Sequence, residues 1–267
     1  MPAKDKFDVK KIKSLAQRKA AESESGISGY QVPERAVYIT DPIYKPQQIV
    51  NPRTNQIVAL LVFLSTLVVY MLTQAVTMSF WDSGEYATCI SILGVPHPPG
   101  NPFYIVFGRA FVTLFEAFFS HAVLSAFISG LTSALAVMFT YLITVKLVSM
   151  FKIKSWEAIF AGVIAALFTA YSFTFWMNAI EAEVYSGLVF FVNLIFWLTM
   201  VWVEKSEDFS HQNILLLIVY LFFLGFCVHQ TALQIAPAML FIVVYPLMAK
   251  SIRGTNFWLK AFGYSFV

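Results

Sequence analysis

Charged residues are scarce in this chain, and their scarcity excludes a soluble protein. Only 12% of the 267 residues are Asp, Glu, Lys or Arg, whereas 58% are hydrophobic and 27 are Phe. A soluble domain carries roughly 25% charged residues. Water cannot keep a chain of this composition dissolved as a monomer. The composition therefore predicts an integral membrane protein and excludes a disordered or soluble one.

Cysteine is almost absent as well, with Cys89 and Cys227 far apart in the chain. They form no C-x-x-C pair, which excludes a disulfide framework and a cysteine-based metal or redox motif. The chain also lacks P-loop, G-x-G-x-x-G, G-x-S-x-G, H-E-x-x-H and EF-hand patterns. Internal repeats of the kind that many transporters show are not visible.

The first 56 residues contain no apolar run long enough to cross a bilayer and no signal-peptide pattern. They hold 10 of the 18 Lys and Arg residues. We interpret residues 1–56 as a disordered cytoplasmic tail, and a basic surface helix over Phe7–Ala21 is the alternative. The first apolar run after this tail is then an uncleaved membrane anchor.

Six apolar runs approach the roughly 20 residues that a spanning helix needs. They cover residues 57–79, 122–148, 157–177, 184–203, 213–229 and 231–249. We therefore expect an all-α, multi-pass helical bundle over residues 57–250, with about six transmembrane helices. Residues 251–267 include a further apolar run from Phe257 and are interpreted as the start of another segment of a longer protein.

Basic residues gather on one predicted side of the membrane. If the N-terminus is cytoplasmic, the positive-inside rule leaves Arg109 as the one Lys or Arg on the opposite side. That side then collects five acidic residues and three histidines: Asp82, Glu85, Glu116, Glu181, Glu183, His97, His121 and His229. We expect a functional site there, on the extracytoplasmic face of a bacterial inner membrane or of the endoplasmic reticulum.

Two carboxylates begin the first predicted outer loop. Asp82 and Glu85 are three positions apart, so a helix would place both on one face. One interpretation is a capping box, with Trp81 and Tyr86 as its hydrophobic staple. The other is a carboxylate pair that takes a proton from an attacking hydroxyl or binds a metal ion. The two interpretations can hold together.

His97 precedes Pro98-Pro99-Gly100, which predicts a rigid turn that holds the histidine in an extended conformation. The turn alone explains the pattern, and a histidine positioned to bind a phosphate or a sugar is the alternative. The following stretch, 103–119, is apolar with a thin polar stripe that includes Arg109 and Glu116. The stripe favours a helix lying at the membrane surface. Arg109 would hold a phosphate there or pair with Glu116.

The remaining acidic and histidine residues follow later spans. Glu181 and Glu183 are two apart, so one would face inward and one outward on a helix. Glu183 opens the fourth span, where a carboxylate favours the helix N-terminus; facing the site is the alternative. His229 lies at the turn of the last hairpin, as a packed polar residue or as a ligand.

Several motifs occur in a characteristic order: Phe80-Trp81-Asp82-Ser83-Gly84-Glu85, His97-Pro98-Pro99-Gly100-Asn101-Pro102, Gly108-Arg109, Ala182-Glu183-Val184-Tyr185, Gly225, His229 and Pro237. This order resembles the membrane family catalogued as domain of unknown function 2723. That family is similar to protein O-mannosyltransferases, which have the GT-C glycosyltransferase fold. The resemblance covers residues from about 57 to 250.

The resemblance implies a polyprenyl-phosphate sugar donor and an extracytoplasmic active site. Asp82 would be the catalytic base and Glu85 the second carboxylate, and both are candidate ligands of a divalent cation. The residues that would contact the donor phosphate or the acceptor are His97, Arg109, Glu183, Tyr185 and His229. The implied partners are the donor, an exported protein or glycan acceptor, membrane lipids and a further subunit. Nucleic acid is not expected, because the basic residues are juxtamembrane.

The sequence therefore predicts an inverting glycosyltransferase. A hydroxyl, of the Ser/Thr type on an exported protein, would lose its proton to Asp82 and attack the sugar. The alternative is a non-enzymatic transporter or membrane assembly subunit whose carboxylates couple protons or cations. That alternative predicts ionisable residues near the middle of the spans.

Overall fold

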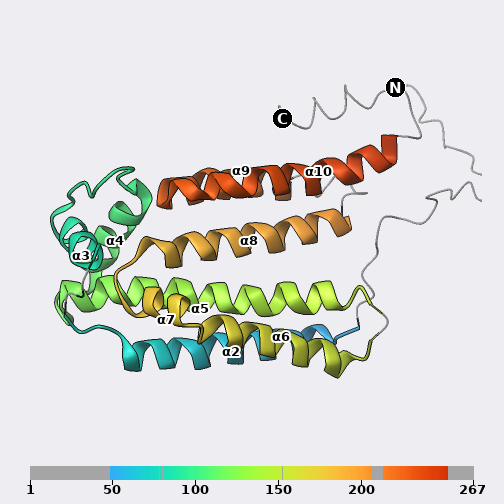
Figure 1. Ribbon diagram of the computed structural model, residues 1–267, viewed down its shortest axis with the longest axis horizontal. Helices are drawn as coiled ribbons and strands as arrows, with labels where there is room; N and C mark the ends of the chain where they lie inside the picture. Colours follow the sequence, from blue (N-terminus) through green and yellow to red (C-terminus); the bar gives the residue numbers. More distant parts are fainter. Residues whose placement is uncertain (1–48, 78, 80, 152, 206–212, 252–267) are drawn as a thin grey trace, which may run out of the picture. The chain divides into compact units, whose positions relative to one another are not determined.

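The computed structural model describes residues 49–77, 79, 81–151, 153–205 and 213–251, with side chains described up to 244. These residues belong to one compact unit, Pro42–Val267, and all of its described elements are helices (Figure 1). The predicted all-α fold is confirmed. The tail before residue 49, the alternative helix at Phe7–Ala21 and the segment after residue 251 lie outside the described residues.

The central helix of the bundle is α5 (His121–Val148), which packs against α2 (Pro52–Thr73), α6 (Ser155–Ala170) and α8 (Val184–Lys205) (Figure 1). Small residues dominate the buried face of α5, among them Ala126, Gly130, Ser133, Ala134 and Ala136. Small side chains let neighbouring helices approach closely, which is how membrane helices associate in the absence of a hydrophobic driving force.

Three described helices, α2, α5 and α8, are long and apolar enough to cross a membrane. A fourth span exists if α6 and α7 (Phe173–Ile180) are one bent unit, with 66° between them. The helix α9 (Asn213–Val228) and the stretch Gln230–Val244 are apolar but shorter. A 16-residue helix such as α9 extends about 24 Å, less than the roughly 30 Å hydrocarbon core. The described part thus has three or four candidate spans, fewer than the six expected.

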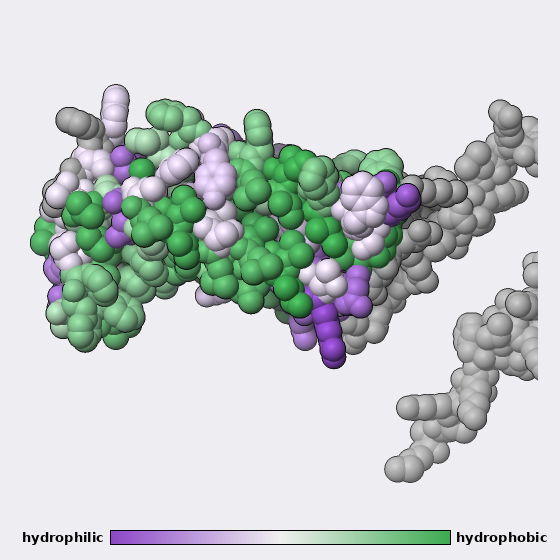
Figure 2. Space-filling model, turned by 90° about the horizontal axis from the view of Figure 1, so that it is seen from below, coloured by the Kyte–Doolittle hydropathy of each residue, from purple (hydrophilic) through white to green (hydrophobic). Residues whose placement is uncertain are grey.

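The surface agrees with a membrane protein. On the face viewed in Figure 2, hydrophobic residues cover the middle of the bundle and the most hydrophilic residues gather near its two ends. Large apolar side chains such as Leu60, Leu64, Phe160, Phe168 and Phe223 are each at least 45% exposed. Lipid would cover such side chains.

The third predicted span is not one continuous helix. It breaks at Tyr171 and Ser172, and Ser172 is extended, with φ −65° and ψ 138°. Its hydroxyl donates to the carbonyl of Thr169 at 2.9 Å, a local bond that competes with helix continuation. The Tyr70 hydroxyl donates to the Ala170 carbonyl at 3.0 Å and so satisfies a carbonyl at the end of α6.

The first helix, α2, begins at Pro52 and ends at Thr73, earlier than the predicted 57–79 at both ends. The side chain of Asn51 accepts a hydrogen bond from the Arg53 amide, and Pro52 is the first helical residue. Both features favour a helix start. Residues 52–56 therefore belong to the helix and not to the tail.

Two short helices, α3 (Ser83–Ile92) and α4 (Pro102–Phe115), lie at one end of the bundle, on the left in Figure 1. Both pack against α5, and α4 also packs against α9. The predicted helix over 103–119 is confirmed at 102–115, while its place at a membrane surface stays a prediction. The chain continues after α9 through the 3₁₀ helix η2 (Gln230–Ile235) to α10 (Ala236–Ser251).

Candidate active site

The carboxylates at the start of α3 do not cap it. Asp82 stands at the cap position but its side chain makes no capping hydrogen bond. Glu85 turns away from the start of the helix toward His97. Trp81 is 93% exposed whereas Tyr86 is buried, so the two form no staple. The capping-box interpretation is therefore wrong, and both carboxylates are available for other partners.

Glu85 binds His97 through both of its carboxylate oxygens. The His97 amide donates to Oε1 at 2.6 Å, and the ring Nδ1 lies 2.8 Å from Oε2. The hydrogen bonds from His97 lower the pKa of Glu85, and the same side-chain bond raises the pKa of His97. Because a carboxylate is an acceptor, Nδ1 carries the proton in this pair. The bond therefore fixes both the orientation and the tautomer of the ring.

Asp82 lies on the other side of the His97 ring, with its Oδ2 3.9 Å from Nε2. One ligand atom from each of Asp82, Glu85 and His97 falls within 4.8 Å of the others. The side chain of Asp82 remains 47% exposed. Of the two carboxylates, Asp82 is thus the one that a substrate can reach without breaking a hydrogen bond to His97.

The loop that carries His97 is held at its far end as well. Gly100 closes a turn by donating to the His97 carbonyl at 2.9 Å, and its φ of +87° favours glycine. The rigid turn and the positioned histidine, which the sequence left as alternatives, occur together.

Asn101 connects this loop to the other end of the described chain. Its side chain is buried in the left-handed backbone conformation (φ 43°), which Asn tolerates. Its Nδ2 donates to the Val228 carbonyl at 2.7 Å, and its Oδ1 accepts from the Tyr86 hydroxyl at 3.4 Å. Asn101 therefore joins α3, α4 and the end of α9, and brings His229 toward the first loop.

Glu183 lies in an extended segment before α8. Its amide donates to the Ser129 hydroxyl at 2.9 Å, and that hydroxyl lies 3.1 Å from the Glu183 carbonyl. The residue is 9% exposed, and its Oε2 has no hydrogen-bond partner among the described residues. Burial, followed by the charge of Asp82, raises the pKa of Glu183 to about 7. Glu183 is therefore partly protonated near neutral pH.

Glu183 is buried whereas Glu181 is half-buried, so the two carboxylates differ in exposure as predicted. This difference does not come from a helix, because α7 ends at Ile180 and α8 begins at Val184.

His229 caps η2, and its ring lies beside that of Tyr185. Its Nδ1 accepts from the Thr231 amide at 3.3 Å and lies 2.8 Å from the Thr231 hydroxyl. The rings of Tyr185 and His229 have centroids 5.1 Å apart. Burial, together with the charge of His97, lowers the pKa of His229. His229 is thus a neutral imidazole whose Nε2 carries the proton and is a donor.

We call Asp82, Glu85, His97, Glu183 and His229 the acid–histidine cluster. Direct contacts join the first three. The charge of Asp82 helps to raise the pKa of Glu183, and the charge of His97 helps to lower the pKa of His229. Three segments far apart in the sequence supply these residues. The structure therefore brings together most of the predicted site residues, and Tyr185 lies beside them.

Arg109 belongs to a second polar group. Its guanidinium donates to the Ser91 carbonyl at 2.7 Å and lies 3.7 Å from the Glu116 carboxylate. His121 lies 3.2 Å from the same carboxylate. Ser91 is six residues beyond Glu85 on α3, about 9 Å along the helix axis. The pairing with Glu116 is the alternative that the structure shows, and a role of Arg109 toward phosphate stays a prediction.

Sequence reasoning assigned no role to Asn101 or Ser129, and gave Tyr86 only a packing role. Asn101 carried a signal, since Asn before Pro at a helix start is a favourable cap that also tolerates positive φ. Ser129 carried none, because a serine within an apolar helix usually bonds its own backbone. Its role appears only once the segment around Glu183 is folded against α5.

Comparisons with known proteins agree with this picture. A family model described as the protein O-mannosyl-transferase TMEM260 N-terminal domain matches residues 82–252. The protein O-mannosyl-transferase tmem260 of Dictyostelium discoideum is 30% identical over 158 residues, which is 57% of this chain and 18% of that protein. Its namesake in Mus musculus is 31% identical over 153 residues, 57% of this chain and 20% of that protein.

The chain thus spans about a fifth of the length of the curated relatives it matches. No solved structure matches it significantly. The match begins at Asp82 and includes every residue of the acid–histidine cluster. The resemblance to O-mannosyltransferases that the sequence motifs indicated is confirmed.

Proposed function

Because the chain belongs to the family of protein O-mannosyl-transferase TMEM260 N-terminal domains, we propose that it carries the active site of a membrane glycosyltransferase. The donor is a polyprenyl-phosphate sugar, mannose by the names of the relatives. The acceptor is a hydroxyl of the Ser/Thr type on an exported protein. The reaction takes place on the extracytoplasmic side, in a GT-C-like fold.

The observation that carries this proposal is the unequal state of three neighbouring carboxylates. Glu85 is engaged by His97, and Glu183 is buried with a raised pKa. Asp82 is half-exposed and makes no capping bond. A general base must be accessible to the proton that it removes. Asp82 is the carboxylate of the three that meets this condition.

In the proposed step the acceptor hydroxyl gives its proton to Asp82, and its oxygen forms a bond to the anomeric carbon. The bond between that carbon and the phosphate oxygen breaks, and the phosphate leaves with the electron pair. A single displacement of this kind inverts the anomeric centre. His97, fixed by Glu85, keeps its Nε2 3.9 Å from Asp82 Oδ2, beside the proposed base.

Donors beside the cluster would stabilise the leaving phosphate. His229 is neutral with a proton on Nε2, the ring of Tyr185 lies next to it, and Glu183 is uncharged when protonated. The N-terminus of α8, which follows Glu183, also favours an anion. None of these groups repels a phosphate at neutral pH when Glu183 holds its proton.

A cavity beside Tyr185 supports a lipid-linked donor. It has a volume of about 450 Å³, lies between α7 and the start of α8, and is lined mainly by apolar surface that includes Phe175 and Val189. An isoprenoid chain needs an apolar path of this kind next to the phosphate site.

A divalent cation is a further part of the proposal. Asp82 and Glu85 would hold it together with His97, because one ligand atom from each of the three residues lies within 4.8 Å of the others. When bound, the cation supplies positive charge beside the phosphate. Transfer measured with and without a chelator, followed by addition of Mn²⁺ or Mg²⁺, tests this. Full activity in the chelator would exclude the cation.

The central test is sugar transfer from polyprenyl-phosphate mannose to a hydroxyl acceptor by purified wild-type and Asp82→Asn protein. We expect the variant to lose about 10²–10⁴-fold in rate, the contribution of a general base. The matched control is Glu116→Gln, a carboxylate of the second polar group, which should keep its activity. Full activity of Asp82→Asn would remove Asp82 from the mechanism.

The positions of the charged residues argue against the transporter alternative. In the described parts of α2, α5, α6 and α8, every Asp, Glu, Lys and Arg lies in a first or last turn: Arg53, Lys146, Glu157, Glu204 and Lys205. Proton- or cation-coupled transport requires ionisable groups within the spans. These basic residues all lie at the end of the bundle away from α3 and α4, which by the positive-inside rule supports a cytoplasmic N-terminus.

A further inference from the structure

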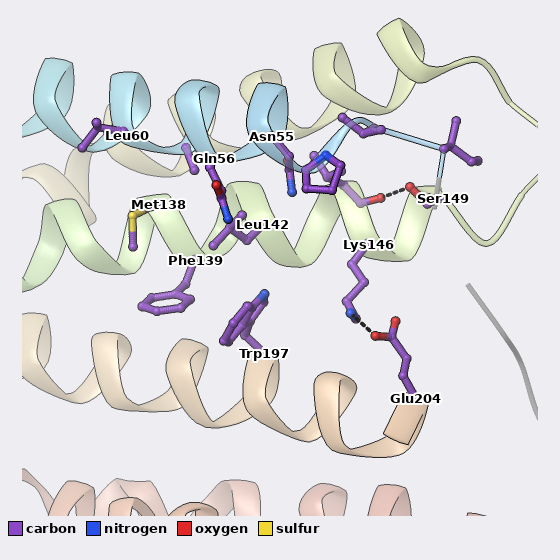
Figure 3. A pocket seen from close by; sticks show the side chains of 15 residues that line it. Asn55, Gln56, Leu60, Met138, Phe139, Leu142, Lys146, Ser149, Trp197 and Glu204 are labelled. Carbon is purple, nitrogen blue, oxygen red and sulfur yellow. Dashed lines mark hydrogen bonds and ion pairs between the residues drawn. The ribbon is translucent and has the colours of Figure 1, made fainter. Parts of the chain in front are cut away.

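A second cavity of about 700 Å³ lies at the end of the bundle opposite the acid–histidine cluster. Figure 3 shows it over α5 (green), between the start of α2 (blue) and the end of α8 (orange). Its polar side chains come from the start of α2, the end of α5 with its C-cap residue, and the end of α8: Asn55, Gln56, Lys146, Ser149 and Glu204. Three spanning helices end at this level, so the polar part of the cavity lies where lipid headgroups lie.

The polar part contains a half-buried ion pair that is incompletely satisfied. Lys146 Nζ lies 2.6 Å from Glu204 Oε2, and the two side chains are 19% and 22% exposed. The other carboxylate oxygen, Oε1, is buried without a hydrogen-bond partner among the described residues, and so is Oδ1 of Asn55. Both atoms are acceptors, so each of them lacks a donor. Lys146 keeps further N–H groups that can bind an anion.

The deeper part of the cavity is apolar. Leu60, Met138, Phe139, Leu142 and Trp197 line it, one to three turns farther into the spans than the ion pair. In Figure 3 their side chains follow one another along α2, α5 and α8, to the left of Lys146 and Glu204. At the helix ends the cavity offers unpaired acceptors and the N–H groups of Lys146, and apolar surface follows farther into the bundle. A phospholipid has the same order, with a charged headgroup followed by acyl chains.

We propose that this cavity binds a phospholipid with a primary ammonium headgroup, of the phosphatidylethanolamine class. The ammonium donates to Glu204 Oε1, and the phosphate accepts from Lys146. An acyl chain follows Met138, Phe139 and Trp197. The quaternary ammonium of phosphatidylcholine has no N–H and cannot donate to Glu204 Oε1. An anionic headgroup such as that of phosphatidylglycerol would place no cation beside Glu204.

The test is lipid retention by the purified wild-type protein, measured by native mass spectrometry. The protein is titrated with phosphatidylethanolamine, phosphatidylcholine and phosphatidylglycerol that carry identical acyl chains. We expect phosphatidylethanolamine to be retained preferentially. Glu204→Gln, which keeps the size but removes the charge, should weaken its retention about tenfold, as expected for one charge-assisted hydrogen bond. The matched control Glu157→Gln, at the start of α6, should retain it like the wild type.

A second measurement needs no variant and so does not depend on the folding of one. Binding to the folded state alone raises the Tm of the wild-type protein. Phosphatidylethanolamine should therefore raise Tm by about 2–4 °C over phosphatidylcholine of the same chains. Equal retention of the two lipids, a preference for phosphatidylglycerol, or unchanged retention by Glu204→Gln would each overturn the proposal. Neither measurement involves sugar transfer, so the result is independent of the proposed function.

Discussion

Both carboxylate oxygens of Glu85 bind one residue, His97, which lies twelve positions away in the chain. One oxygen accepts from the backbone amide at 2.6 Å and the other pairs with Nδ1 at 2.8 Å. The first bond fixes the loop to α3, and the second fixes the ring. As a result Nε2 lies 3.9 Å from Asp82, the carboxylate that remains accessible.

Glu85→Gln should lower the pKa of His97. The hydrogen bond to Glu85 is the main cause of the raised pKa of His97, and an uncharged amide cannot replace the carboxylate. The pKa can be measured by NMR on histidine-labelled protein. Glu116→Gln, which changes the partner of His121, is the control and should leave the titration of His97 in place. An unchanged His97 pKa in Glu85→Gln would contradict the geometry.

The same pair defines a pH window for stability. Because folding raises the pKa of His97, protonated His97 stabilises the fold at pH values below 6.5, the ordinary pKa of histidine. This stabilisation is lost as the pH rises through the raised pKa. Because folding lowers the pKa of Glu85, ionised Glu85 stabilises the fold at pH values above 4.5, its ordinary pKa. This stabilisation is lost as the pH falls through the lowered pKa. The Tm difference between wild type and Glu85→Gln should therefore be largest between the two shifted values. An equal difference at pH 9 would show that the pair is not its cause.

Glu183→Gln should stabilise the protein at alkaline pH. The folded pKa of about 7 exceeds the ordinary 4.5, so the folded state binds the proton more tightly and loses stability as the pH rises from 4.5 through 7. Ionisation costs the folded state about 3 kcal/mol on this basis. Gln resembles the protonated carboxyl, so the variant should have a higher Tm at pH 8.5 and an unchanged Tm at pH 5. A lower Tm at both values would mean that the carboxylate has a partner.

Asn101→Ala should destabilise the protein more than Asn101→Gly. Both variants remove the donor to the Val228 carbonyl, which costs about 1–3 kcal/mol when a buried acceptor is left unpaired. Ala adds about 1–2 kcal/mol of strain in the left-handed backbone conformation, which Gly adopts freely. Thermal unfolding should rank wild type above Gly and Gly above Ala. If Ala equals Gly, the left-handed conformation is not required.

Gly162→Ala should loosen the packing of α6 on α5. A Cβ at this position would lie 2.6 Å from Val145 Cγ2 and 2.9 Å from Tyr141 Cδ2, so these side chains or one of the helices must shift. Overpacking of this kind costs about 1–3 kcal/mol. Gly94→Ala is the matched control, because its Cβ would meet atoms no closer than 3.4 Å. Equal Tm values for the two variants would show that the interface yields without cost, and adding Val145→Ala should recover part of the loss in Gly162→Ala.

The helix bounds agree with the sequence prediction where the length of an apolar run sets them. They differ from it where hydrogen bonds at a helix end set them. The runs at 122–148 and 184–203 agree with α5 and α8 within two residues, because apolar length alone determines such spans. The run at 157–177 breaks because the Ser172 hydroxyl and the Tyr70 hydroxyl satisfy carbonyls at the end of α6. The Tyr70 contact joins residues 100 positions apart, and no window of the sequence contains both.

The candidate site was predictable in its residue types and not in its pairings. Scarce charge made Asp82, Glu85, Glu183 and His97 conspicuous in the sequence. Spacing alone favoured a capping box for Asp82 and Glu85, because a three-residue separation fits a helix start. In the structure Glu85 binds His97 instead, and the chain between them leaves α3 through the left-handed residue Leu93. Arg109 looked available for a phosphate, but it lies beside Glu116.

The bond from Asn101 to Val228 also has a consequence for biosynthesis. It joins positions 127 residues apart, so the loop that carries His97 leaves the ribosome long before its partner exists. At about 5–20 residues per second the interval is on the order of ten seconds. During that time the first loop is at the membrane without the contact from α9, exposed to proteases and chaperones. A nascent chain stopped before residue 228 should therefore show the His97 loop open to cleavage, and one extended past His229 should protect it.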